Sequence, residues 1–129
     1  METDTGIVTM VKKWALTKRA QYEAVYKLGT AKSDSLIVLK KIPNNLNYNR
    51  YGFSISKNVG NAVKRNYIRR TLKEIARWTL VKPGFDIVFI ARRGASNVDF
   101  HQFKRSVLKL ISRSDLSINE NEMANPKTN

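Results

Sequence analysis

A run of cations in the middle of the chain is the feature best suited to chemistry. Between residues 57 and 77 a single acid, Glu74, accompanies seven basic side chains, which are Lys57, Lys64, Arg65, Arg69, Arg70, Lys73 and Arg77. On a helix of about 100° per residue, those from 69 to 77 share one flank, with Arg65 at the edge of the apolar stripe. Like charges four residues apart destabilise a helix by roughly 0.2–0.5 kcal/mol per pair. The flank therefore favours phosphate binding over a solvated face, where lysine usually pairs with glutamate.

The segment leading into this helix strengthens the same interpretation. Residues 56–63 supply small and amide side chains, Asn61 among them, at a predicted helix N-terminus. Free backbone N–H groups and the positive end of the helix dipole attract anions there. Such turns are common, so the segment gains weight only from the cations that follow it.

Groups able to catalyse a reaction or hold a metal are sparse. His101 is the one histidine, cysteine is absent, and the five acids between residues 11 and 113 include no pair three or four residues apart. No helix face therefore offers two carboxylates to a metal, and no nucleophile has a base beside it. We interpret His101 as a helix-surface or partly packed residue, Asp86 as structural and Asp99 as a helix cap or dipole partner. The sequence predicts no catalytic residue and no metal site.

The overall charge indicates a polyanionic partner. The 129 residues include 24 lysines and arginines against 10 acids, a net charge of +14. Residues 11–113 alone hold 23 basic residues and 5 acids, a difference of +18. A content of 42% hydrophobic and 9% aromatic residues suffices for a core, which excludes a wholly disordered basic tail. Nucleic acid is the leading partner and an anionic membrane surface the second.

The chain length suits one domain. We expect a flexible extension over 1–13, a single RNA-binding α+β domain over 14–113 and a disordered tail over 114–129, which is rich in Asn, Ser and Glu. No apolar run reaches the ~18 residues of a membrane helix, and the acidic start does not fit a secretory signal. A cytoplasmic location is therefore expected.

Hydrophobic periodicity predicts alternating helices and strands. Helices are expected from Thr17, as N-cap, to Gly29, from residue 61 or 62 to 80, and from residues 97–99 onward. Strands are expected over 36–39, 50–56 and 85–91, with an asparagine-rich loop at 43–49. This order of helix, two or three strands, long helix, strand and helix predicts an α+β or split βαβ sandwich.

The strand at 50–56 has two unlike faces. Tyr51, Phe53 and Ile55 alternate onto one side, which we expect to be packed. Gly52 and Ser54 lie on the other side, which is small, polar and predicted to be open.

Residues 50–74, RYGFSISKNVGNAVKRNYIRRTLKE, resemble the signature of the bacterial ribonuclease P protein subunit. That signature reads roughly R-x-G-[FL]-x-[VI]-S-K-K-x-G-x-A-V-x-R-N-x-x-[KR]-R-x-[LI]-[RK]-E. The resemblance extends from about Leu16 to Ile111, and it is long and gapless across glycine, amide and basic positions. One departure is Tyr67, where many members carry arginine, so one contact of the family is in question.

The resemblance implies a fold and two binding surfaces. The fold is an αβββαβα sandwich with a left-handed βαβ crossover. One surface contacts the catalytic RNA subunit through Lys57, Asn61, Lys64, Arg65, Asn66, Arg69, Arg70 and Lys73. The other is a cleft that holds the 5′ leader of precursor tRNA, and its matching positions are Tyr22, Tyr26, Lys40 and Ser54. Spacing alone favours a core stripe for the two tyrosines, and only the resemblance reverses that preference.

In the family, the RNA subunit and its bound Mg²⁺ hydrolyse the phosphodiester, which implies a protein cofactor without catalytic residues of its own. Its partners would be the ribonuclease P RNA and precursor tRNA, with neither membrane nor DNA. Alternatives stay open at this point. A basic ribosomal or RNA-chaperone protein would share the charge without needing a leader cleft. A DNA-binding module would need a helix free to enter a major groove, and a self-sufficient nuclease would cut without added RNA.

Overall fold

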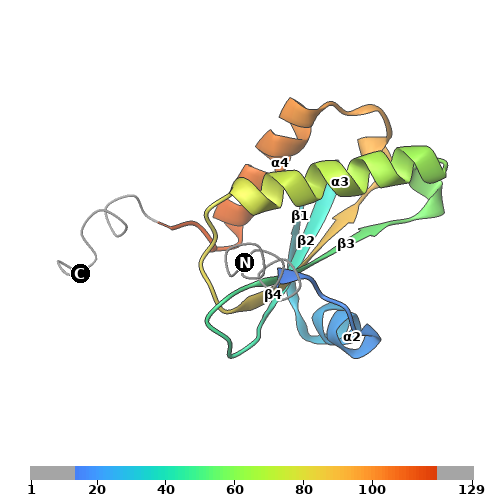
Figure 1. The fold of residues 1–129 in the computed structure, drawn as a ribbon. Coiled ribbons are helices and arrows are strands. Elements are labelled where there is room, and N and C mark those ends of the chain that lie inside the picture. The colour runs from blue at the N-terminus through green and yellow to red at the C-terminus, as the bar shows by residue number, and fades with distance from the viewer. Residues whose placement is uncertain (1–13, 119–129) are drawn as a thin grey trace, which may run out of the picture.

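The computed structural model describes residues 14–118, so the expectations for residues 1–13 and 119–129 lie outside the described part of the chain. Its elements in order are α2 (Arg19–Leu28), β1 (Thr30–Ser33), β2 (Ile37–Pro43), β3 (Arg50–Ile55), α3 (Ala62–Trp78), β4 (Phe85–Ala91) and α4 (Phe100–Arg113), with 3₁₀ turns at Lys57–Val59 and Arg93–Asn97. This order confirms the expected α+β class and the αβββαβα arrangement (Figure 1).

The four strands form one mixed sheet in the order β1-β2-β4-β3. Strand β2 pairs antiparallel with β1 and β4, whereas β3 and β4 run parallel and are joined through α3. Because β3 and β4 are hydrogen-bonded neighbours, no strand lies between them, and the expectation of a split βαβ unit is wrong. The left-handed crossover stays a prediction of the resemblance.

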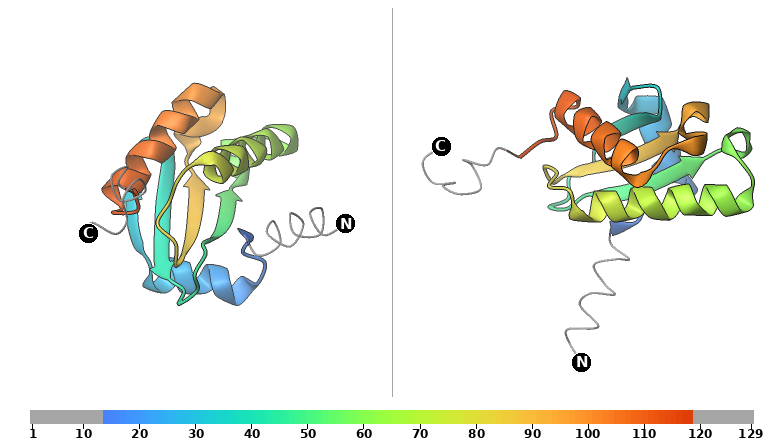
Figure 2. Two further views of the ribbon diagram at one scale, coloured as in Figure 1. Left: turned by 60° about the vertical axis from the view of Figure 1, so that its left-hand side comes forward. Right: turned by 90° about the horizontal axis from the view of Figure 1, so that it is seen from above.

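Helices cover both faces of the sheet, with α3 and α4 on one side and α2 on the other (Figures 1 and 2). Side chains of a strand alternate between these faces. Toward α3 and α4 the sheet buries residues such as Leu39, Phe89 and Tyr51 in the main core. Toward α2 it buries Val88, which packs in a smaller cluster with Val25 of the helix. The predicted packed face of β3 is confirmed, since Tyr51 and Ile55 are buried and Phe53 packs against that core.

Helix α2 begins later than predicted. Its N-cap is Lys18, not Thr17, because the Gln21 side chain accepts hydrogen bonds from both backbone N–H groups, at 3.0 Å each. Gly29 ends the helix as predicted, although with an extended backbone of φ −77°. Glycine is required by space, since a Cβ would lie 2.5 Å from the Val25 carbonyl oxygen and 2.8 Å from that of Lys41.

The C-terminal boundary at residue 114 is too early. Leu116 is fully buried, and its carbonyl oxygen accepts a hydrogen bond from the Lys82 backbone N–H at 2.8 Å. Helix α4 itself is capped as predicted, with the Asp99 carboxylate accepting from the Gln102 backbone N–H at 2.9 Å. The packed chain therefore continues past α4 for at least three residues.

Candidate nucleic-acid interface

The rotation of α3 about its axis is fixed by its apolar stripe. Ile68, Leu72, Ile75 and Ala76 are buried against the sheet and α4. This leaves the predicted cations half-buried or exposed on one side of the helix. We call this side the basic flank, and its residues are Arg65, Asn66, Arg69, Arg70, Lys73 and Arg77.

The charge of the basic flank is not neutralised within the described chain. Among residues 14–118 the ion pairs are Arg19–Glu23, Arg50–Asp86 and Lys109–Asp34, so none of them includes a cation of α3. The one acid of the helix, Glu74, instead accepts a hydrogen bond from the indole N–H of Trp78 at 2.6 Å. The flank therefore carries a positive field that an external polyanion can neutralise.

Hydrogen bonds hold several of these side chains in place without using up their donors. Arg65 donates to the Gly60 carbonyl at 2.8 Å, and Arg69 donates to the Asn66 side-chain oxygen at 2.9 Å. Each guanidinium has five N–H donors, so most stay available for phosphate oxygens. Lys64 differs, since its Nζ donates to Asn97 at 2.9 Å and turns toward the second 3₁₀ segment.

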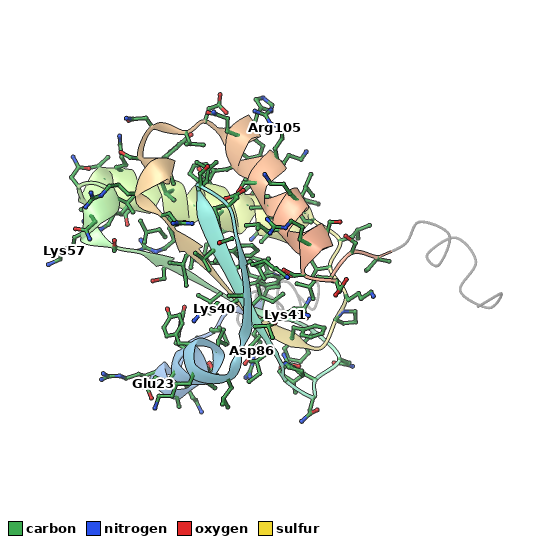
Figure 3. All side chains as sticks on the ribbon, turned by 180° about the vertical axis from the view of Figure 1, so that it is seen from behind. Glu23, Lys40, Lys41, Lys57, Asp86 and Arg105 are labelled. Carbon is green, nitrogen blue, oxygen red and sulfur yellow. The ribbon has the colours of Figure 1, made fainter. Side chains whose placement is uncertain are left out.

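The N-terminal end of α3 adds the remaining predicted residues. Asn61 caps the helix by accepting a hydrogen bond from the Lys64 backbone N–H at 2.9 Å. Its side chain is thus engaged in capping and is less available to RNA than the prediction implies. Lys57 is exposed on the 3₁₀ turn before the helix and points away from the body of the molecule (Figure 3).

A second surface lies where α2 meets the sheet. Lys40, Val88 and Gly52 are aligned across β2, β4 and β3, on the face that α2 covers. The Tyr22 ring rests on Gly52, where an added Cβ would lie 2.5 Å from the ring. Any residue larger than glycine there would displace Tyr22.

The predicted leader residues converge on this surface. The Tyr22 and Tyr26 rings lie 6.3 Å apart, and Lys40 Nζ lies 5.8 Å from the Tyr26 ring. Lys40 also donates to the Tyr26 carbonyl at 3.1 Å, which fixes the amine beside the rings. In Figure 3 the Lys40 side chain lies on the side of the sheet that holds α2 and its Glu23. Ser54 is half-buried one row farther along the same face, in register with Ile90.

The tyrosines are neither core residues nor fully exposed. Tyr22 is half-buried, and Tyr26 keeps 39% of its surface exposed. Burial raises the pKa of Tyr22, and neighbouring Tyr26 adds to this, whereas a hydrogen bond from the Phe53 backbone and the charge of Arg69 act in the opposite direction. The Tyr22 ring rests on Gly52 of β3, and α3 contacts β3 as well, so the two surfaces adjoin around β3, one of the two edge strands of the sheet.

Sequence reasoning gave no role to Trp14, which the structure places beside the basic flank. Its ring packs on Tyr51 at 4.6 Å between centroids, and residue 15 forms a bridge to the edge strand β3. With Arg70, Lys73 and Arg77 it lines a pocket of about 220 Å³. A lone tryptophan outside any periodic segment gives no pattern from which this position follows.

The other candidate groups for chemistry are the histidine and the carboxylates of the described residues. His101 lies exposed on α4, as predicted, with its ring edge-on to Phe100 at 5.9 Å. Within residues 14–118 no group of three or more histidine or carboxylate side chains could hold a metal ion. No helix in that range is long and apolar enough to cross a membrane.

An α+β sandwich with an uncompensated cationic flank and an adjoining aromatic surface defines a nucleic-acid-binding protein by class. Residues 10–115 match the family model described as Ribonuclease P. The chain belongs to the bacterial ribonuclease P protein family, which confirms the expectation drawn from residues 50–74.

Individual relatives agree in sequence and in fold. The chain is 41% identical over 113 residues to the ribonuclease P protein component of Dehalococcoides mccartyi strain CBDB1, covering 88% of this chain and 94% of that one. It is 39% identical over 106 residues to the ribonuclease P protein component of Clostridioides difficile strain 630, covering 80% of this chain and 93% of that one. The solved RNase P protein of Staphylococcus aureus superposes with a TM-score of 0.75 at 27% identity, over 81% of this chain and 98% of that one. The solved RNase P protein of Thermotoga maritima superposes with a TM-score of 0.72 at 30% identity, over 77% of this chain and 96% of that one.

Proposed function

We propose that this chain is the protein subunit of a ribonuclease P holoenzyme in which the RNA performs the cleavage. The basic flank of α3 binds the RNA subunit, and the surface formed by Tyr22, Tyr26, Lys40 and Ser54 binds the 5′ leader of precursor tRNA. The observation that carries the proposal is that both surfaces adjoin β3, while no ion pair among residues 14–118 includes an α3 cation.

The cations would act by screening. Phosphates of the RNA subunit and of the substrate repel each other when they are brought together, and lysine or arginine between them releases counterions and lowers that repulsion. Aromatic rings beside a lysine suit a single strand of any sequence, because every base has a π-face for stacking. This pairing explains how a leader without fixed sequence could be held.

Mg²⁺ would be bound mainly by the RNA. This part of the proposal is supported by the fact that the acids between residues 14 and 113 are engaged elsewhere, in Arg19–Glu23, Ser106–Asp34, Trp78–Glu74, Arg50–Asp86 and the Asp99 cap. Hard oxygen ligands grouped around one point are what Mg²⁺ requires. The chain would contribute positive charge and contacts to the substrate, and Mg²⁺ would supply Lewis-acid chemistry within the RNA.

The role of α2 is tested by replacing both of its tyrosines. In the holoenzyme, Tyr22→Ala/Tyr26→Ala is expected to weaken binding of precursor tRNA by roughly thirtyfold or more, because two stacking rings are lost at about 1 kcal/mol or more each. Affinity for mature tRNA, which has no leader, should not change. Tyr22→Phe/Tyr26→Phe keeps the rings and serves as the matched control, with near-normal affinity for both ligands. Equal losses for precursor and mature tRNA would show that the tyrosines support the fold and do not bind the leader.

A further inference from the structure

Exposed aromatic rings of α3 and α4 lie beside the basic flank, away from its centre. Tyr67 keeps 50% of its surface exposed, and Phe100, at the start of α4, keeps 38%. Together with Arg70, Thr71 and Glu74, these two rings line an open surface pocket of about 440 Å³. Exposed apolar rings gathered at one hollow are typical of a binding site.

Packing does not explain the position of Tyr67. The inward positions on this part of the helix belong to Ile68 and Thr71, both buried. Tyr67 contributes its backbone carbonyl, which accepts a hydrogen bond from the Thr71 hydroxyl at 2.8 Å. Any residue can supply that carbonyl, so the aromatic ring itself has no structural partner among the contacts described.

Arg70 links this pocket to the basic flank. Arg70 lines both the Tyr67 pocket and the neighbouring pocket that Trp14 lines with Lys73 and Arg77. Glu74 also borders both pockets, but its carboxylate is hydrogen-bonded to Trp78. A phosphate held by Arg70 would therefore place the base of the same nucleotide within reach of the rings.

We propose that Tyr67 and Phe100 form a stacking site for an unpaired base of the RNA subunit, with the neighbouring phosphate held by Arg70. This site rests on the proposed function. It adds a contact in which aromatic rings stack on a base, in addition to the cations that contact phosphates. A second copy of this chain is a poor occupant, because the net charge of +14 repels it and interface cores are depleted of charged residues.

The test compares affinity and its salt dependence for the ribonuclease P RNA subunit. Tyr67→Ala and Phe100→Ala are each expected to weaken binding roughly five- to hundredfold, the range for loss of one stacked base. The slope of log K against log salt should not change, because stacking releases no counterions. Arg70→Ala should instead reduce that slope by about 1. Tyr67→Phe should bind normally, whereas Tyr67→Leu, which keeps apolar bulk without a π-face, should not.

Thermal unfolding and sedimentation velocity, measured beside RNA affinity, distinguish a lost stacking contact from misfolding and from self-association. Thermal unfolding of Tyr67→Ala should match the wild type, because the ring is half exposed. Normal RNA affinity in Tyr67→Ala and Phe100→Ala, with weak binding in Arg65→Ala/Arg69→Ala, would overturn the stacking site and leave the proposed function standing. Normal affinity in all of these variants would overturn both. A dimer of the RNA-free chain that Tyr67→Ala dissociates in sedimentation velocity would assign the surface to self-association and overturn the stacking site.

Discussion

Replacing Arg65 and Arg69 together by alanine should weaken binding to ribonuclease P RNA by roughly a hundredfold, since each removes a charge-assisted contact to phosphate. With roughly 5–8 phosphates neutralised by the wild type, its slope of log K against log salt should be about −4 to −7. The double variant should reduce the magnitude of that slope by about 2. Both side chains lie on the surface side of α3, so folding should not be affected.

A matched control separates a specific site from general attraction. Arg105 and Arg113 of α4 lie near the β1–β2 hairpin, at the opposite edge of the sheet from β3; Arg105 lines a pocket with Asp34, and Arg113 donates to the Ser33 carbonyl. Figure 3 shows Arg105 on α4. Arg105→Ala/Arg113→Ala removes the same two positive charges. This variant should lower the affinity for ribonuclease P RNA far less than Arg65→Ala/Arg69→Ala does. Equal losses in the two double variants would mean that the chain attracts RNA without the basic flank having a special role.

The largest effect on stability is expected from the ion pair that joins the parallel strands. Asp86 is buried, and both of its oxygens accept hydrogen bonds from Arg50 at 2.8 Å, with Asn44 donating a third at 3.0 Å. Asp86→Ala leaves the Arg50 charge without a partner in a site where that side chain is only 24% exposed. We expect a loss of about 3 kcal/mol, the lower end for breaking a buried pair.

Chemical denaturation of Asp86→Ala measures this loss directly. Glu23→Ala provides the comparison, because the Arg19–Glu23 pair is solvent-exposed. Such surface pairs contribute about 0.2–1 kcal/mol at most. Similar losses in the two variants would show that the Arg50–Asp86 pair does not hold β3 against β4.

Periodicity predicted those elements whose burial follows a regular spacing. The stripe of Ile68, Leu72 and Ile75 correctly placed the core side of α3 and therefore the basic flank. Strand β1 was not assigned, because its four residues are all exposed and lack apolar alternation. Leu116 was assigned to a tail for a similar reason, since a single buried leucine after a helix forms no pattern.

The assembly of the candidate sites depended on tertiary structure. Lys40 comes to the Tyr26 ring only because β2 lies beside β4 and α2 crosses that face, which no spacing within residues 22–40 encodes. The basic flank likewise comes to lie near Tyr22 because α3 and Tyr22 both contact β3 at an edge of the sheet. The sequence was enough to predict which residues belong to the candidate sites. Their convergence in space could not be predicted, because it depends on the order of the strands in the sheet.

The central claim is that the chain assists an RNA catalyst, and reconstitution tests it most directly. The chain is mixed with the ribonuclease P RNA of its own organism and a precursor tRNA, at a Mg²⁺ concentration too low for the RNA to act alone. We expect the mixture to release the 5′ leader at the mature end, while the chain without RNA leaves the precursor intact. An inactive mixture, or cleavage by the chain without RNA, would contradict that claim.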